Sequence, residues 1–271
     1  MEVRESTGVQ ARTNNGMIRP QSFRVVAGPC TVESYEQFEA SARAVKEAGF
    51  SYVRGGAFKP RTSPYSFQGL GVEGLRIMSE VAGDLGLKVV TEIMDPADID
   101  VVMEHAQILQ IGTRNMHNFS LLKRVGSAIK GSKEHGVILK RGFAATVEEW
   151  LLAAEYVTSS GGDNVVLCER GIRTFEPSTR FTLDLSAVIV AKRLSELPVI
   201  VDPSHAAGRR DLVVPLSKAA VAAEADGLLV ESHHEPREAL CDGEQALPVE
   251  DLMTLRETLS PFASAMGRQV I

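Results

Sequence analysis

Eight short, almost continuously apolar runs recur along the chain of 271 residues, and each is followed by a longer stretch of mixed character. The runs cover residues 23–28, 52–56, 88–93, 106–112, 136–142, 164–171, 198–204 and 226–232. A strand that faces water on one side alternates apolar and polar residues, whereas a continuously apolar strand is covered on both faces. The runs therefore predict the strands of a parallel sheet.

The stretches between the runs have the pattern of amphipathic helices. The clearest patterns cover residues 34–49, 72–86, 146–162 and 184–196. Ser34 and Thr146 stand at plausible N-caps, and Gln37 and Glu149 follow three residues later, as in a capping box. Strand and helix therefore alternate along the whole chain.

This alternation predicts an α/β fold, a single-domain (β/α)8 TIM barrel over residues 21–271. A doubly wound open sheet is the alternative, but no G-x-G-x-x-G motif follows the first strand and no linker divides the chain. Residues 1–20 are polar and precede the first strand. We interpret them as an N-terminal arm or a short lid on the closed bottom of the barrel.

Composition excludes several classes of protein. The formal charge of −6 and the pI of about 5.6 argue against a general nucleic-acid or anionic-membrane surface. No stretch approaches the roughly 20 apolar residues of a membrane helix, and the N-terminus lacks the apolar core of a signal peptide. Three cysteines make a disulfide framework improbable. We therefore expect a cytoplasmic protein that binds neither nucleic acid nor membrane.

Four side chains with metal-ligand chemistry lie at or beyond strand ends. Cys30, His205 and Glu231 each follow an apolar run, and Asp242 lies in the loop beyond the last one. Loops after the strands of a parallel barrel converge on one face. A thiolate, an imidazole and two carboxylates suit a divalent transition metal such as Mn, Fe, Co or Zn, and suit Mg or Ca poorly. Taken singly, however, Cys30 could be a buried apolar residue, His205 a core histidine and Asp242 a turn residue.

Two further histidines follow Glu231. Because strand residues alternate sides, His233 is a candidate to support the ligands if the strand continues, whereas His234 should face solvent.

Basic residues follow the other strands and predict anionic ligands. Arg54, Arg114, Lys140 and Arg170 could surround one small polyanion, and Lys59, Arg61, Thr62 and Ser63 offer cations and hydroxyls for a second phosphate. The second group opens an unusually long loop, residues 59–71, of a kind that is often functional. Glu92 ends the third strand and could position a water or form an ion pair with Arg54 or Arg114.

Seven segments together resemble the catalytic domain of 3-deoxy-D-arabino-heptulosonate 7-phosphate (DAHP) synthases. The branch is the one that also contains 3-deoxy-D-manno-octulosonate 8-phosphate (KDO8P) synthases. The segments are AGPC at 27–30, RGGAFKPRTSPYSFQGLG at 54–71, QIGTRNM at 110–116, LKRG at 139–142, ERG at 169–171, DPSHAAG at 202–208 and ESHHEP to CDGEQAL at 231–247. This combination is highly specific and extends over most of the chain.

The resemblance implies a role for each group of residues. The implied metal ligands are Cys30, His205, Glu231 and Asp242; phosphoenolpyruvate would be bound by Arg54, Lys59, Arg114, Lys140 and Arg170, and erythrose 4-phosphate by Lys59, Arg61, Thr62 and Ser63. We place the catalytic roles on Lys59, Lys140, His205 and Glu92, without assigning the proton transfers. The implied reaction is a metal-dependent condensation of the two substrates that gives DAHP and phosphate, the first step of the shikimate pathway to aromatic amino acids.

Three positions depart from the family pattern, namely His117, His234 and Cys241. Cys241 adjoins the presumed ligand Asp242, which suggests the hypothesis that Cys241 and Cys30 oxidise together in the metal-free protein.

Three alternatives remain open at this point. One is a KDO8P synthase-like condensation with arabinose 5-phosphate, although KPRTS at 59–63 favours the four-carbon sugar. Another is a Schiff-base aldolase that acts through Lys140, and the third is a sugar-phosphate sensor without catalysis. In each case we expect a homo-oligomer, either a dimer or a tetramer.

Overall fold

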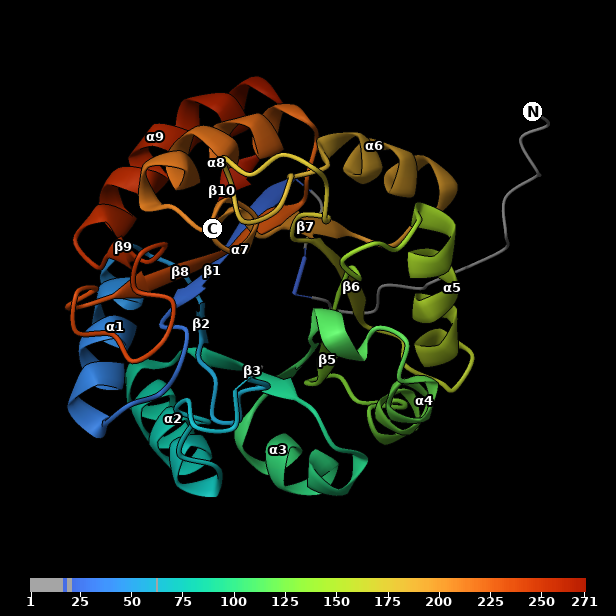
Figure 1. Cartoon of the computed structure of the whole chain (residues 1–271), viewed down its shortest axis with the longest axis horizontal. Helices are drawn as coiled ribbons and strands as arrows, with labels where there is room; N and C mark the ends of the chain where they lie inside the picture. The colour runs from blue at the N-terminus through green and yellow to red at the C-terminus, as the bar shows by residue number, and fades with distance from the viewer. Residues whose placement is uncertain (1–16, 19–20, 62) are drawn as a thin grey trace.

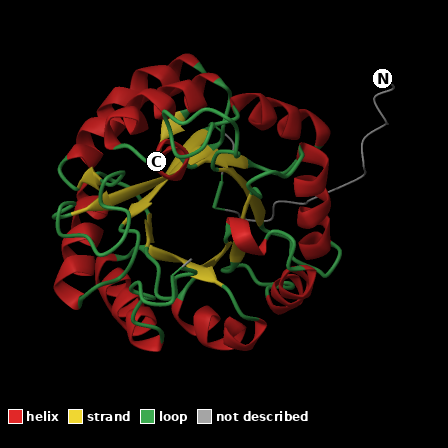
Figure 2. Ribbon diagram, in the orientation of Figure 1, coloured by secondary structure: helices red, strands yellow, loops and turns green. Residues whose placement is uncertain are grey.

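The computed structural model describes residues 17–18, 21–61 and 63–271. Eight strands form a closed parallel barrel, and helices surround it on the outside (Figures 1 and 2). The strands are β1 (Ser22–Gly28), β2 (Tyr52–Arg54), β3 (Lys88–Ile93), β4 (Ile108–Ile111), β5 (Gly136–Lys140), β6 (Val165–Glu169), β7 (Val199–Val201) and β8 (Gly227–His233). The barrel closes where β8 pairs in parallel with β1, from Arg24 opposite Gly227 to Gly28 opposite Glu231. The predicted (β/α)8 barrel is confirmed.

The helices lie where the amphipathic patterns predict them. They are α1 (Tyr35–Glu47), α2 (Val72–Leu85), α3 (Ile99–His105), α4 (Phe119–Ala128), α5 (Val147–Thr158), α6 (Leu185–Leu194), α7 (Pro203–Ala207), α8 (Val213–Ala222) and α9 (Asp251–Ala265). The Ser34 side chain accepts a hydrogen bond from the Gln37 backbone N–H, and Thr146 and Glu149 form a complete capping box. Short strands β9 (Leu247–Pro248) and β10 (Gln269–Val270) extend the sheet beside β8 and β1.

Five of the observed strands, β2, β4, β5, β6 and β7, end earlier than predicted, and local reasons are clear for β7 and β2. β7 ends at Val201, because the Asp202 side chain accepts a hydrogen bond from the His205 backbone N–H and so caps the short helix α7. β2 ends at Arg54 instead of residue 56, where two glycines follow. Both changes shorten the strand and lengthen the loop that carries polar residues.

Buried apolar residues form two layers around the strands. The larger layer lies between the sheet and the helices, and a smaller one fills the interior of the barrel with residues such as Val90, Ile138 and Leu229. Met17 belongs to the interior layer and is 1% exposed. Most of the predicted N-terminal arm lies outside the described residues, so its boundary at residue 20 stays a prediction.

Gly28 allows β1 and β2 to approach closely at the end of the barrel. Its φ is +146°, and a Cβ atom there would lie 2.2 Å from the Arg54 backbone oxygen. The Arg54 side chain in turn reaches the carbonyl of Pro29, the residue before Cys30, at 3.0 Å. In the described part of the chain, no helix is both long enough and apolar enough to cross a membrane.

Candidate functional site

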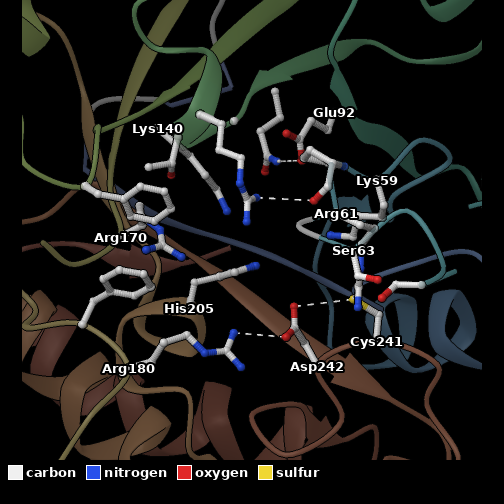
Figure 3. A pocket seen from close by; sticks show the side chains of 18 residues that line it. Lys59, Arg61, Ser63, Glu92, Lys140, Arg170, Arg180, His205, Cys241 and Asp242 are labelled. Carbon is white, nitrogen blue, oxygen red and sulfur yellow. Dashed lines mark hydrogen bonds and ion pairs between the residues drawn. The ribbon is translucent and has the colours of Figure 1, made fainter. Parts of the chain in front are cut away.

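A polar pocket of about 430 Å³ opens at the ends of the strands (Figure 3). Its lining comes from segments far apart in the sequence, from Lys59 after β2 to Asp242 after β8. Strand ends of a parallel barrel meet at one face, which explains how these segments come together. The pocket thus lies where the sequence predicts a site.

The four predicted metal ligands lie together at the base of this pocket. One potential ligand atom from each of Cys30, His205, Glu231 and Asp242 lies within 4.8 Å of the other three. Cys30 and Glu231 are buried, while His205 and Asp242 are partly exposed toward the pocket. A thiol, an imidazole and two carboxylates at this spacing fit a divalent transition metal, because such ions accept sulfur, nitrogen and oxygen ligands together.

Glu231 is held on several sides. Its Oε1 lies 2.7 Å from Arg54 Nη1 and 3.3 Å from His205 Nε2, while its Oε2 accepts a hydrogen bond from Gln245. Burial alone would raise the pKa of this carboxyl group, but the charges of His205 and Arg54 lower it overall. The buried carboxylate is therefore kept ionised, as a metal ligand must be.

His205 is oriented by a second carboxylate. Its Nδ1 lies 2.7 Å from Asp202 Oδ2, so that Nε2 faces Glu231. The same Asp202 oxygen accepts a hydrogen bond of 2.6 Å from Lys140 Nζ. Burial lowers the pKa of His205, although the charges of Asp202 and Glu231 act in the opposite direction. Burial alone would raise the pKa of Asp202. His205 and Lys140 stabilise its charged form, so its pKa lies well below the usual range.

Asp242 and Cys30 form the other half of the cluster. Asp242 Oδ2 lies 3.2 Å from Cys30 Sγ, and Asp242 Oδ1 accepts a hydrogen bond of 3.0 Å from Arg180 Nη1. The Sγ atoms of Cys30 and Cys241 are 3.2 Å apart, and both thiols are free. Burial raises the pKa of the Cys30 thiol, and its contacts with Cys241 and Glu231 act in the same direction. The charges of His205 and Arg180 outweigh burial at Asp242 and lower its pKa.

The pocket above the cluster is lined by cations. They are Lys59, Arg61, Arg114, Lys140, Arg170 and Arg180. Arg54 is not among them, because it lies buried beneath the pocket against Glu231 and the Pro29 carbonyl. Its predicted contact with phosphoenolpyruvate therefore stays a prediction.

Arg170 has no counter-ion at hydrogen-bonding distance in the part of the chain that the structure describes. Its guanidinium carbon lies 4.3 Å from the Phe181 ring centre and 5.1 Å from that of Phe143. Its Nε and Nη1 atoms are buried and have no hydrogen-bond partner among the residues described. Desolvation lowers the pKa of this guanidinium. Buried donors without partners are costly, so an anionic ligand in the pocket would satisfy them.

Arg141 and Glu169 hold both ends of the loop that carries Arg170 and Arg180. Arg141 Nη1 lies 3.0 Å from Glu169 Oε2 and 2.9 Å from Asp184 Oδ2. Glu169 Oε1 accepts hydrogen bonds from the backbone N–H groups of Gly171, at 2.7 Å, and Asp184, at 3.3 Å. Arg141 thus points away from the pocket, unlike its neighbour Lys140.

The remaining predicted residues differ in their placement. Ser63 and Arg61 line the pocket, and Arg61 also contacts the Cys241 sulfur. Thr62 lies outside the described residues. Glu92 lines the pocket and accepts a hydrogen bond of 3.4 Å from Gln110. The alternative that Glu92 pairs with Arg54 or Arg114 is wrong: Arg54 pairs with Glu231, and Arg114 donates to the Pro60 carbonyl at 3.4 Å.

The two histidines after Glu231 also differ from expectation. His233 ends β8, and its Nε2 lies 3.6 Å from Glu33 Oε2 while its Nδ1 accepts a hydrogen bond from the Glu235 backbone N–H. Both ring nitrogens are thus turned toward partners outside the four-ligand cluster, so the predicted support of the ligands is wrong. His234 is half-buried beside His233 and does not simply face solvent.

Sequence reasoning missed Arg180, Gln110 and Gln245. Gln245 lies in the CDGEQ segment that contains Asp242, so the motif itself could have indicated it. Gln110 ends the apolar run of β4 in the same way that Glu92 ends β3, and the two pair across these strands. Arg180 lies in the middle of a loop, where no strand-end position marks it.

Comparisons with known proteins identify the family that the sequence motifs resemble. Residues 9–267 match the DAHP synthetase I family. A phospho-2-dehydro-3-deoxyheptonate aldolase of Thermotoga maritima is 51% identical over 248 residues, which are 92% of this chain and 72% of the relative. A 2-dehydro-3-deoxyphosphooctonate aldolase of Syntrophotalea carbinolica is 32% identical and covers 90% of this chain and 92% of its own.

Solved structures agree with the sequence comparison. The crystal structure of the T. maritima DAHP synthase superposes with a TM-score of 0.89 at 50% identity, covering 94% of this chain and 73% of that one. A truncated form of the T. maritima enzyme gives 0.86 at 46% identity, covering 94% and 91%.

Proposed function

Because the chain belongs to the DAHP synthetase I family, we propose that it catalyses the condensation of phosphoenolpyruvate with erythrose 4-phosphate to DAHP and phosphate. It is an enzyme, a transferase that serves the first step of the shikimate pathway. The observation that carries this proposal is the position of a four-ligand cluster at the base of a pocket lined by cations. Both substrates carry phosphate, and one carries an aldehyde oxygen that must be activated.

The metal would be held by Cys30, His205, Glu231 and Asp242. A divalent ion at this position supplies Lewis-acid polarisation of the aldehyde oxygen. Mn, Fe, Co and Zn all suit the ligand set, and the residues alone do not choose among them.

Phosphoenolpyruvate would occupy the part of the pocket lined by Arg114, Lys140 and Arg170. The free donors of Arg170 match a phosphate or carboxylate group, since guanidinium groups bind such anions in bidentate fashion. Arg61 and Ser63 would bind the phosphate of erythrose 4-phosphate, together with Thr62. Lys59 lines the same pocket on the side of Arg61 and Ser63, and we assign it to both substrates. Bringing two phosphates together requires such neutralisation, so positioning and electrostatic stabilisation are the main contributions of the protein.

Lys140, Asp202 and His205 form a continuous polar chain beneath the substrate pocket. Asp202 accepts from Lys140 at 2.6 Å and lies 2.7 Å from the His205 ring. The Nζ atom of Lys140 is held in this ion pair, and attack on a carbonyl group would require it to leave Asp202. A Schiff-base mechanism through Lys140 is therefore disfavoured, and a role in charge stabilisation or proton transfer is favoured.

The experiment that tests this function compares two sugar phosphates. Phosphate release from phosphoenolpyruvate should occur with erythrose 4-phosphate, be much slower with arabinose 5-phosphate, stop with chelator and return with Mn or Co. Faster release with arabinose 5-phosphate would assign the octulosonate reaction. Activity that survives chelation and is trapped by borohydride would assign a Schiff-base aldolase, and no release at all would support a sensor.

A pair of variants links the assay to the pocket. Arg170→Ala should raise the KM for phosphoenolpyruvate because it removes the cation with free donors. Arg209→Ala removes a half-exposed arginine outside the pocket, which pairs with Asp211, and should leave the KM unchanged.

Three further statements stand as proposals. We propose that residues 21–271 act as one catalytic unit, that the protein is cytoplasmic and that it assembles as a dimer or tetramer. Neither nucleic acid nor membrane is an expected partner, given the net charge of −6.

A further inference from the structure

Arg180 contacts one oxygen of the ligand Asp242 and leaves the other toward the cluster. Its Nη1 lies 3.0 Å from Asp242 Oδ1 (Figure 3), and Asp242 Oδ2 lies 3.2 Å from Cys30 Sγ. The arginine therefore does not occupy the oxygen that faces the other ligands. It fixes the rotation of the carboxylate group instead.

The backbone of Arg180 is fastened to the helix that carries His205. The Arg180 N–H donates to the Ala207 carbonyl at 3.0 Å, and the Phe181 N–H donates to the Ala206 carbonyl at 2.8 Å. Both acceptors belong to α7, within two residues of His205. Arg180 thus has a defined position relative to a second ligand of the cluster.

The orientation of the Asp242 side chain depends on contacts with other residues. The φ of Asp242 is +54°, in the left-handed region that residues with a side chain seldom adopt. It lies in the loop between β8 and β9, without a regular strand or helix to hold it. Contacts of the side chain, with Arg180 on one oxygen and Cys30 on the other, therefore set its orientation.

We infer that Arg180 is a positioning residue for the metal ligand Asp242. By holding Oδ1, Arg180 would leave Oδ2 available to an ion. Arg180 also connects the loop after β6 to His205 on α7 and to Asp242 after β8. This inference rests on the metal site of the proposed function. Hydrogen-bonded partners of metal ligands commonly contribute about 10- to 100-fold to metal affinity.

The test is a calorimetric titration of metal-stripped protein with Mn²⁺, without substrates. Arg180→Ala should raise the Kd for Mn²⁺ by about tenfold or more. Arg180→Lys keeps the charge but loses the planar fork, so it should raise the Kd less. Arg209→Ala is the matched control, because it breaks an exposed Arg–Asp pair of 2.8 Å whose aspartate is not a ligand, and its Kd should equal that of the unaltered protein.

An unchanged or lower Kd in Arg180→Ala, with the thermal unfolding of the metal-free protein unchanged, would overturn the inference. A raised KM for erythrose 4-phosphate with an unchanged Kd for Mn²⁺ would also overturn it, and would make Arg180 a substrate ligand instead. If Arg180→Ala unfolds, Arg180→Lys decides the question by the same titration. Because no substrate is present, loss of Mn²⁺ affinity supports this inference even if the condensation assay fails.

Discussion

Replacing Arg141 with methionine should destabilise the protein strongly, although Arg141 does not face the pocket. The guanidinium pairs with Glu169 at 3.0 Å and with Asp184 at 2.9 Å. The Glu169 side chain is 0% exposed, so methionine would leave a buried carboxylate without its counter-ion. Removing one partner of a buried ion pair typically costs about 3–5 kcal/mol.

For Arg141→Met we expect the lower end of this range of destabilisation. Glu169 keeps two backbone N–H donors, from Gly171 and Asp184, after Arg141 is removed. We therefore expect a loss of about 3 kcal/mol in the free energy of unfolding. The double variant Arg141→Met with Glu169→Gln should recover most of this loss, because an amide carries no charge and its oxygen can still accept from both N–H groups.

The loss should also depend on pH in a defined direction. Burial raises the pKa of Glu169, and the charge of Arg141 offsets part of this increase. Removing Arg141 should therefore raise the pKa of Glu169 further. A carboxyl group with a raised pKa in the folded state favours folding at low pH and loses that contribution as pH rises through its folded pKa. Arg141→Met should therefore be less destabilised at pH 5 than at pH 8.

The assay is urea unfolding of both single variants, the double variant and the unaltered protein at these two pH values. Arg43→Met is the control, because Arg43 and Glu39 form an exposed pair on α1 and its loss should matter far less. The reasoning is refuted if Arg141→Met unfolds like this control, or if its destabilisation is larger at pH 5 than at pH 8.

Three other predictions concern the site itself. Gly28→Ala should lower the melting temperature and the soluble yield, because its Cβ would meet the Arg54 carbonyl at 2.2 Å, and thermal unfolding measures this. When metal-stripped protein is treated with a hydroperoxide, Cys30 and Cys241 should form a disulfide, so that two of the three free thiols are lost. The variant Cys241→Ser should form no such disulfide. Thiol titration and mass spectrometry measure both results, and three remaining free thiols in the unaltered protein would contradict the prediction. Lys140→Arg should lower kcat but keep Mn²⁺ affinity, since a cation still pairs with Asp202; stopped-flow kinetics and calorimetry separate the two quantities.

Much of the fold could be predicted because the pattern repeats. Each strand is covered on both faces, so its apolar run is visible in the sequence, and His205 and Glu231 were indicated by their positions at or just beyond strand ends. Asp242 could not be predicted in this way, because a loop with positive φ brings it to the cluster. In the sequence, only the family resemblance indicates Asp242 as a metal ligand.

The errors have a common physical origin in the loops and strand ends. His233 follows Glu231 by two residues, but β8 ends there and the ring meets Glu33 from the loop after β1. Arg180 was missed because its partner Asp242 is 62 residues away, a separation that no local pattern encodes. Strand positions could thus be predicted, whereas contacts between loops required the structure.

The side chain of Asp202 gives the enzyme a form of communication between its two ligands. One carboxylate oxygen contacts Lys140, which lines the pocket, and His205, which belongs to the four-ligand cluster of the proposed metal site. A ligand that changes the charge near Lys140 would alter the stabilisation that Asp202 gives to His205, and a metal beside His205 would do the converse. The binding of phosphoenolpyruvate and the binding of metal would therefore be linked. By thermodynamic reciprocity, the factor by which metal changes the affinity for phosphoenolpyruvate equals the factor by which phosphoenolpyruvate changes the affinity for metal. Each ligand would thus change the affinity for the other through a single shared anion.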